Sequence, residues 1–168
     1  MPVYAGPPIS GASVSLRRVS EDQVLLAGRD SDLELARDAR CFYKATRDEA
    51  TLFFGLCTEA GDLVGQVILQ RQLPDRKEAV LGIHIFRPEN RYRGYGSDAV
   101  AVACAYGFQE LGLGRIVLSV SEANEAARRC YQKCGFTEVG RVKDEPNMIA
   151  MVLGHRLQSD PTADRRNA

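Results

Sequence analysis

The amino-acid sequence predicts an α/β fold of the α+β kind, in which a mixed, mostly antiparallel sheet of about seven strands is flanked by about four helices. Two β-prone runs, 51–58 and 63–72, flank a short glycine-containing turn, which is typical of a β-hairpin. The next strand, 78–86, alternates apolar and mixed positions. Helical patterns follow at 96–110 and 124–134, and a short apolar strand lies between them.

The length and charge of the chain limit the classes of protein to consider. At 168 residues it is long enough for one domain with a substantial core. We expect a flexible segment rich in Pro and Gly over 1–12, a single domain over 13–157 and a disordered polar tail over 158–168. Lys plus Arg and Asp plus Glu both number 22, so a nucleic-acid-binding surface is not expected.

The cysteines and the absence of long apolar runs indicate a cytoplasmic protein. The five cysteines are Cys41, Cys57, Cys104, Cys130 and Cys134. They form no Cys-x-x-Cys pair and are typical of small buried residues in a reducing compartment. Cys130 and Cys134 are one helical turn apart, but the chain has only two histidines, so we expect no metal site. No run resembles a signal peptide or approaches the roughly 18 apolar residues of a membrane span.

The remaining elements follow from local patterns. We expect a first strand over 13–17, and the run Ser20 to Asp22 then predicts a helix start, because carboxylates are favourable near a helix N-terminus. One or two helices should occupy the stretch up to Thr46. The strands 51–58, 63–72 and 78–86 should form an antiparallel meander. A closing hairpin is expected from 136–142 and 147–153.

The stretch from Glu78 to Ser97 carries the strongest functional signal in the chain. Apolar residues recur at every second position up to Ile85, which indicates a strand with one face against a core. The run from Arg91 to Ser97 contains two glycines and two arginines, and a helical pattern follows at once. Glycines let the backbone approach a ligand, and the unpaired amides and dipole of a helix start attract anions. Because guanidinium groups bind phosphate oxygens, this run predicts a pyrophosphate site.

The nucleotide that contains this pyrophosphate stays open at this step. The segment from Gly94 to Ala99 also fits the G-x-G-x-x-A form of a dinucleotide-binding turn. Such a unit requires a second strand with an acidic residue about 20 residues further on, whereas 115–120 contains neither Asp nor Glu. A phosphate loop of the Walker type is disfavoured too, because no Gly-Lys-Ser/Thr follows the glycines.

Two motifs together resemble one enzyme family. The pattern Arg91-x-x-Gly94-x-Gly96 after an apolar strand resembles the acetyl-CoA pyrophosphate loop of the GNAT superfamily of N-acetyltransferases. Downstream, Asn124-x-x-Ala127-x-x-x-Tyr131-x-Lys133-x-Gly135-Phe136 is similar to the helix and following strand of that superfamily. The resemblance implies a GNAT-like fold and an N-acetyltransferase that moves an acetyl group from acetyl-CoA to a primary amine, by direct attack in a ternary complex.

The resemblance also implies roles around the cofactor. Backbone amides near Ile85 or Phe86 would bind the thioester carbonyl, and a separation of the strands 78–86 and 115–120 would admit the pantetheine arm. The implied cofactor-binding residues are Ile85, Phe86, Arg91, Tyr92, Arg93, Gly94, Tyr95, Gly96, Ser97, Asn124, Ala127 and Tyr131.

Three residues are candidates for catalysis. Tyr131 shares a helical face with Asn124 and Ala127. A phenol with the usual pKa of about 10 is protonated at neutral pH, so Tyr131 suits a general acid toward the leaving thiolate, and the alternative is a core aromatic. For the general base, the resemblance favours a carboxylate on the central strand, which makes Glu78 the first choice. His84 is the second, because histidine titrates near neutrality, and some family members use no dedicated base.

The acceptor is not specified by these residues. A small amine, such as a polyamine or an aminoglycoside-like antibiotic, and a protein N-terminus all fit. A catalytically silent acyl-CoA-binding regulatory module is the alternative of a different class, although such a module has no use for an acid beside the sulfur. We expect no membrane or nucleic-acid partner, and the resemblance allows a homodimer.

Overall fold

The structure is a computed structural model that describes residues 6–28, 51–71 and 77–155. Its strands are β1 (Ile9–Ser10), β2 (Val14–Arg17), β3 (Thr51–Thr58), β4 (Leu63–Arg71), β5 (Glu78–Ile85), β6 (Arg115–Ser121), β7 (Thr137–Val142) and β8 (Glu145–Gly154). Its helices are α1 (Glu21–Gly28), the short 3-10 helix η1 (Pro88–Asn90), α3 (Tyr95–Gln109) and α4 (Glu125–Lys133). The part of the predicted helical stretch between residue 29 and Thr46 and the predicted tail lie outside the described residues.

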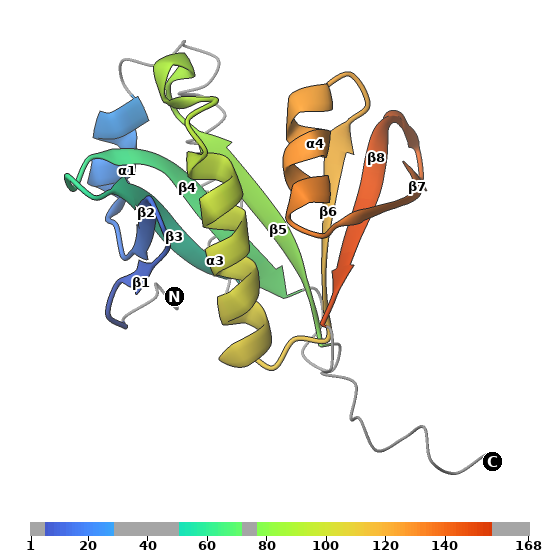
Figure 1. Ribbon diagram of the computed structural model, residues 1–168, viewed down its shortest axis with the longest axis horizontal. Coiled ribbons are helices and arrows are strands. Elements are labelled where there is room, and N and C mark those ends of the chain that lie inside the picture. Colours follow the sequence, from blue (N-terminus) through green and yellow to red (C-terminus); the bar gives the residue numbers. More distant parts are fainter. Residues whose placement is uncertain (1–5, 29–50, 72–76, 156–168) are drawn as a thin grey trace.

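The described strands form one sheet of eight in the order β1-β2-β3-β4-β5-β6-β8-β7 (Figure 1). Neighbours are antiparallel except for β5 and β6, which are parallel. The predicted fold class, with its mostly antiparallel mixed sheet and the meander β3-β4-β5, is therefore confirmed. The sequence analysis places no strand before residue 13, whereas β1 pairs Ile9 with Leu16 of β2. The division of the chain into segments and one domain stays a prediction.

Helix α1 begins where the sequence predicts, and its start is closed by two reciprocal hydrogen bonds. The amide of Gln23 donates to Ser20 Oγ over 3.2 Å, and the amide of Ser20 donates to Gln23 Oε1 over 2.8 Å. This exchange satisfies two of the amides that a helix start leaves without partners. Helix α1 is thus anchored directly after β2.

The sheet separates two cores of different size, because side chains alternate between its faces. Helices α3 and α4, which lie side by side in Figure 1, pack over the larger core, where Val67 and Leu69 of β4 are buried. Ile68 lies between those two residues in the chain and belongs to the smaller core on the opposite face, together with Val24 of α1. One face therefore supports α3 and α4, and the other supports α1.

The parallel strands β5 and β6 pair along only part of their length. Their register covers Glu78 with Arg115, Ala79 with Ile116 and Val80 with Val117, and it goes no further. Figure 1 shows the two strands meeting at this end and diverging toward the ends that lead to α3 and α4. The predicted separation between these strands is present.

The chain closes with the hairpin β7–β8, which turns at Lys143 and Asp144, and Asp144 adopts a left-handed φ of 64°. Asp tolerates this conformation better than most residues. In the part of the chain that the structure describes, no helix is both long and apolar enough to cross a membrane.

Candidate functional site

The start of α3 contains the run that the sequence predicts to be an anion site. Gly94 is the residue before the helix and has φ 83°, a left-handed conformation that glycine adopts without strain. No described side chain caps the helix, so its first amides are left for water or a ligand. A Cβ placed on Gly96 would meet no atom within 4 Å, which leaves open space in front of these amides. Arg91 and Arg93 are both exposed beside them.

Helix α4 presents the second motif, and it begins at Asn124 as the sequence predicts. The Asn124 side-chain oxygen accepts the amide hydrogen of Ala127 over 3.1 Å, so Asn124 caps α4 and only its NH₂ group is left to bind a ligand. Tyr131 is half-buried on the larger core, with its ring 5.9 Å from the ring of Phe136. Burial, with smaller contributions from Cys130 and Cys134, raises the pKa of Tyr131 to about 12. The phenol is therefore a stable hydrogen-bond donor at neutral pH.

The two motifs meet at Ser97, in the first turn of α3. Ser97 Oγ lies 3.1 Å from Cys130 Sγ, and Cys134 Sγ donates to the Ser97 carbonyl over 3.5 Å. The residue beside Tyr131 therefore touches the helix start that contains the predicted anion site. Residues that are 33 positions apart in the chain are joined in one site.

The amides proposed for the thioester carbonyl are reduced to one candidate. The Phe86 amide already donates to the Val64 carbonyl over 3.0 Å, at a bulge where the pairing of β3 with β4 shifts. Phe86 itself is buried in the smaller core. The expectation that the Phe86 amide binds a carbonyl is thus corrected, because the sheet uses that donor, and Ile85 remains.

The structure does not bring the two base candidates together. Glu78 lies at the closed end of the β5–β6 pair, where its carboxylate forms an ion pair with Arg115. His84 lies six residues later, about 20 Å along the strand, on the face opposite α3, and its ring is 5.6 Å from that of Phe86. Both assignments stay predictions. The distance between the two residues excludes a shared role at one atom.

A polar residue that the sequence analysis does not single out lies next to His84. Gln66 of β4 is fully buried, and neither its side-chain nitrogen nor its oxygen has a hydrogen-bond partner in the part of the chain that the structure describes. Its Cα is opposite His84 of β5 on one side and Gly55 of β3 on the other. A Gln between apolar neighbours is the signal in the sequence, and that signal does not reveal burial without a partner.

Asp98 was also missed as a site residue, and it fixes the position of the α3 start. Its carboxylate accepts the amide hydrogens of Ala12, Ser13 and Val14 over 3.0, 2.7 and 2.9 Å, and the Ser13 hydroxyl lies 3.1 Å away. Burial acts to raise the pKa of Asp98, but these hydrogen bonds outweigh it and the pKa is lowered. The β1–β2 connection is thereby tied to the first turn of α3.

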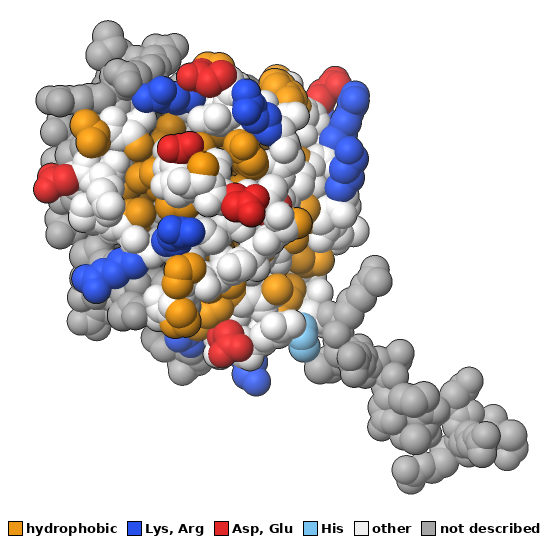
Figure 2. All heavy atoms as spheres, turned by 60° about the vertical axis from the view of Figure 1, so that its left-hand side comes forward, with side chains coloured by type: hydrophobic (Ala, Val, Ile, Leu, Met, Phe, Trp, Pro, Cys, Tyr) orange, Lys and Arg blue, Asp and Glu red, His pale blue; other side chains and the backbone are white. Residues whose placement is uncertain are grey.

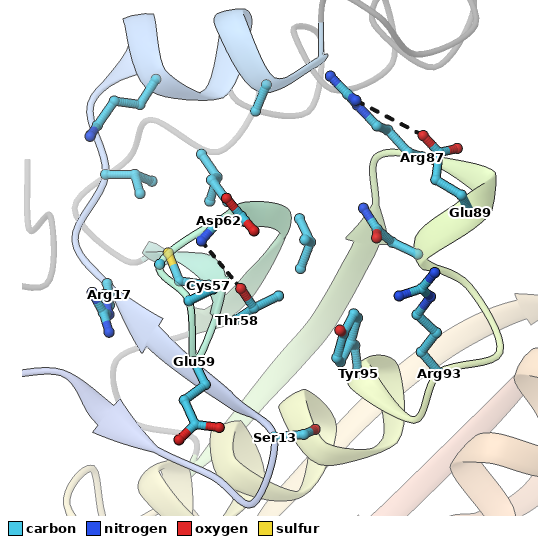
Figure 3. Close-up of a pocket in the computed structure, with 18 of the residues that line it drawn as sticks. Ser13, Arg17, Cys57, Thr58, Glu59, Asp62, Arg87, Glu89, Arg93 and Tyr95 are labelled. Atoms are coloured by element: carbon cyan, nitrogen blue, oxygen red, sulfur yellow. Dashed lines mark hydrogen bonds and ion pairs between the residues drawn. The ribbon is translucent and has the colours of Figure 1, made fainter.

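An open pocket of about 1460 Å³ lies between α1, β2, the β3–β4 turn and the loop before α3. Figure 3 shows Arg93 of that loop and Tyr95, the first residue of α3, on one side and Arg17 of β2 on the other. The charged residues of its lining are Arg17, Arg18, Arg87, Arg93, Glu59, Asp62 and Glu89. On the face drawn in Figure 2, basic and acidic side chains likewise alternate. The pocket therefore does not select a ligand by one sign of charge.

Metal chemistry gains no support from the side chains. Among residues 6–28, 51–71 and 77–155, no three His, Cys, Asp or Glu side chains are grouped as a metal ion would require.

Comparison with known proteins supports this geometry. A family model described as an acetyltransferase (GNAT) domain matches residues 16–137. Alpha/beta-tubulin-N-acetyltransferase 9 of Homo sapiens is 30% identical over 132 residues, which cover 71% of this chain and 62% of that protein. The uncharacterized N-acetyltransferase YnaD of Bacillus subtilis is 25% identical over 107 residues, which cover 63% of this chain and 62% of that protein. The chain thus spans less than two thirds of the length of these relatives.

Solved structures share the fold. An acetyltransferase of the GNAT family from Bacillus anthracis superimposes with a TM-score of 0.71 at 20% identity, covering 88% of this chain and 98% of that one. Spermidine N-acetyltransferase from Vibrio cholerae, solved in complex with CoA and spermine, superimposes with a TM-score of 0.70 at 20% identity, covering 86% of this chain and 96% of that one.

Proposed function

The chain belongs to the GNAT acetyltransferase family, and we propose that it moves an acetyl group from acetyl-CoA to a primary amine by direct attack in a ternary complex. One observation carries the proposal. The uncapped start of α3, the gap between β5 and β6 and the Tyr131 helix are joined through the contact of Ser97 with Cys130. The residues proposed for the pyrophosphate, for the pantetheine arm and for proton donation are thereby linked.

The residues at the α3 start fit a CoA pyrophosphate. The first amides of the helix, from Tyr95 to Ser97, and the exposed guanidinium groups of Arg91 and Arg93 supply hydrogen bonds and positive charge. The open space at Gly96 lets phosphate oxygens approach the backbone. Where β5 and β6 part, their facing backbone groups lose strand partners, and the amide-rich pantetheine arm can replace them.

Catalysis in this proposal depends on orientation and on charge stabilisation at the thioester. The Ile85 amide polarises the carbonyl, and the amine attacks its carbon. The bond from carbon to sulfur then breaks, and the Tyr131 phenol donates its hydrogen to the departing thiolate. Because burial keeps this phenol protonated, the donor is present over the whole neutral range.

Acceptance of the amine proton is assigned to His84 in preference to Glu78. His84 lies near the diverging end of β5, one residue before Ile85, whereas Glu78 is held at the closed end by Arg115. The imidazole lies on the face of the sheet opposite α3, which is the α1 face. The amine acceptor would therefore approach from the α1 face. Histidine has the ordinary pKa that suits proton abstraction near pH 7.

The acceptor is proposed only as a class, a primary amine on a small molecule or at a protein N-terminus. Relatives and neighbours are named for tubulin in one case and for spermidine in another, so their names do not point to one acceptor. The mixed charge of the pocket beside the α3 loop agrees with a broad class.

Two measurements on the full chain test the proposal. In thermal unfolding with acetyl-CoA, CoA or NAD, a ligand at 100 times its dissociation constant adds about 2.7 kcal/mol of stability, and we expect this for the two CoA species only. Thiol release from acetyl-CoA with a panel of amines then tests transfer. Stabilisation by NAD alone would contradict the cofactor. Binding of acetyl-CoA without release to any amine would support a catalytically silent acyl-CoA-binding module.

A further inference from the structure

The contact between α3 and α4 contains a cluster of sulfur groups that the transfer reaction does not use. Cys130 and Cys134 are both half-buried, and both sulfur atoms contact Ser97. Cys104 of α3 is buried nearby in the same core. A packing role alone requires only small apolar groups here, whereas two of these thiols contact one polar residue, Ser97.

The two α4 thiols share their protons unequally. A hydrogen bond from Cys134 lowers the pKa of Cys130 to about 6, with further help from Ser97 and the charge of Lys133, and against the effect of burial. The pKa of Cys134 is raised by the same hydrogen bond and by burial. The pair therefore loses its first proton from Cys130, while Cys134 keeps its proton. The thiolate is the nucleophilic form of cysteine.

The spacing of the pair allows a covalent bond between the sulfurs. Side chains four residues apart on a helix have Cβ atoms about 5–6 Å from each other, and a disulfide requires about 3.5–4.5 Å. Cys134 is the C-cap of α4, and Gly135 follows it with φ 96°. Because no further helical turn depends on Cys134, the end of α4 can move and shorten the distance between the two Cβ atoms.

We propose that Cys130 and Cys134 form a peroxide-reactive dithiol, in which the Cys130 thiolate attacks and Cys134 resolves. The thiolate sulfur attacks one oxygen of a hydroperoxide, the O–O bond breaks, and the other oxygen leaves as water or alcohol after taking a proton. Cys134 then attacks the sulfenic sulfur, and the S–O bond breaks with loss of water. Two thiols are oxidised to one disulfide while one hydroperoxide is reduced.

The disulfide has a consequence for the start of α3. Closing the bond draws both sulfur atoms toward each other and away from Ser97, so the contacts at 3.1 and 3.5 Å are lost. Ser97 belongs to the turn that we propose for the pyrophosphate, so this consequence rests on the proposed function. We expect the loss of these contacts to lower the affinity for acetyl-CoA about fivefold, which corresponds to the net contribution of one hydrogen bond, about 1 kcal/mol.

Peptide mapping tests the chemistry without reference to acetyl transfer. Reduced full-length protein is treated with hydrogen peroxide, alkylated and digested with trypsin, which cleaves after Lys133 and so separates the two cysteines. We expect a disulfide that joins the peptides 130–133 and 134–141, and alkylation of reduced Cys130 about tenfold faster than that of Cys57 at pH 7. A cross-link from Cys130 to Cys104 or Cys41, or equal alkylation rates, would overturn the proposal.

Variants separate this proposal from the proposed function. Cys134→Ser should abolish the cross-link and let Cys130 proceed to sulfinic acid, and Cys57→Ala, a buried cysteine on β3, should cross-link as the unmodified protein does. Acetyl-CoA binding is then measured by calorimetry before and after peroxide. A cross-link with unchanged affinity would overturn the link to the cofactor. Absence of binding in both states, with the cross-link present, would contradict the proposed function alone.

Discussion

The two faces of the sheet differ in how they are built. The face under α3 and α4 holds the larger core, and its site consists of backbone groups at a helix start and of side chains fixed by packing. Among the described residues, the face under α1 holds a core of five buried residues, a histidine and Gln66, whose side chain has no hydrogen-bond partner there. In the proposed function, the first face binds the cofactor and the second faces the amine acceptor.

This contrast has a physical reason. A pyrophosphate is recognised by amides and a helix dipole, which depend on the path of the backbone and on glycines at two positions. An amine acceptor is recognised by the shape and charge of side chains, which can change without altering the fold. The predictions below test whether the two faces perform separate tasks.

The largest effect is expected from Gly96→Asp. A side chain fits there without a clash, so folding should be preserved, while the carboxylate repels the phosphates and occupies their space. We expect at least a 100-fold loss of acetyl-CoA affinity by calorimetry, which corresponds to about 2.7 kcal/mol. Gly154→Asp at the end of β8, also in open space, is the matched control and should bind normally. Normal binding by Gly96→Asp would remove the α3 face from the cofactor site.

The second effect is on turnover by Tyr131→Phe. Loss of the proton donor should lower kcat about 100-fold, while the affinity for acetyl-CoA stays within about twofold. Since the pKa of Tyr131 is raised to about 12, the unmodified enzyme should lose no activity from this group up to about pH 10. An unchanged kcat in the variant, measured by thiol release from pH 7 to 10, would restore the view of Tyr131 as a core aromatic.

The third test concerns the opposite face and compares His84→Gln with Glu78→Gln. We expect a roughly tenfold or greater fall in kcat/KM for His84→Gln near pH 7, because the amide cannot accept the proton at a useful rate. Glu78→Gln removes an ion pair at the closed end of the strands and should change stability by less than about 1 kcal/mol, with turnover preserved. The reverse result would assign the base to Glu78.

The fourth effect is on stability, through Asp98→Ala. The variant leaves the amides of Ala12, Ser13 and Val14 without their acceptor, and we expect a loss of about 2 kcal/mol in chemical unfolding. The folded-state pKa of Asp98 is lowered, so its contribution is complete above the unfolded pKa and disappears as pH falls through the folded value. Asp98→Asn should flatten this acid dependence. Asp62→Ala in the exposed β3–β4 turn is the control.

The smallest effect is expected from Gln66→Leu, and its sign is informative. An apolar residue of similar size removes two buried polar atoms that lack partners, so we expect a gain of about 1 kcal/mol in stability. If the amide serves the acceptor on the α1 face, the same variant should raise KM for the amine without changing acetyl-CoA affinity. A loss of stability would show that Gln66 has a polar partner in the folded protein.

Much of the α3 face could be predicted from the sequence, because its signals are local. Gly94 and Gly96 lie within one turn of the arginines, and Asn124 caps the helix that contains Tyr131, so spacing alone relates these residues. The hairpin β3–β4 and the alternation of β5 are equally local, and the structure confirms both.

What could not be predicted depends on contacts between distant segments. Nothing in the composition near Asp98 reveals that it binds amides 84 to 86 residues earlier. The Phe86 amide was misassigned because its partner, Val64, lies at a bulge that alternation does not show. Burial of Gln66 likewise depends on which groups cover the sheet, and a strand pattern cannot give that.

Because β5 and β6 pair over a short length, the chain could be divided into two fragments between them. In the described sheet, three residue pairs between β5 and β6 join strands β1 to β5 to strands β6 to β8. The exposed Gly112 lies in the connection from α3 to β6. Two polypeptides cut after Gly112 would each keep whole strands, and they would have to reassemble across the β5–β6 pairing and the α3–α4 contact. A ligand bound between β5 and β6 would contact both fragments and stabilise their association. Fragment complementation would then report the concentration of that ligand. The β5–β6 pairing is also where a stretching force should open the fold first.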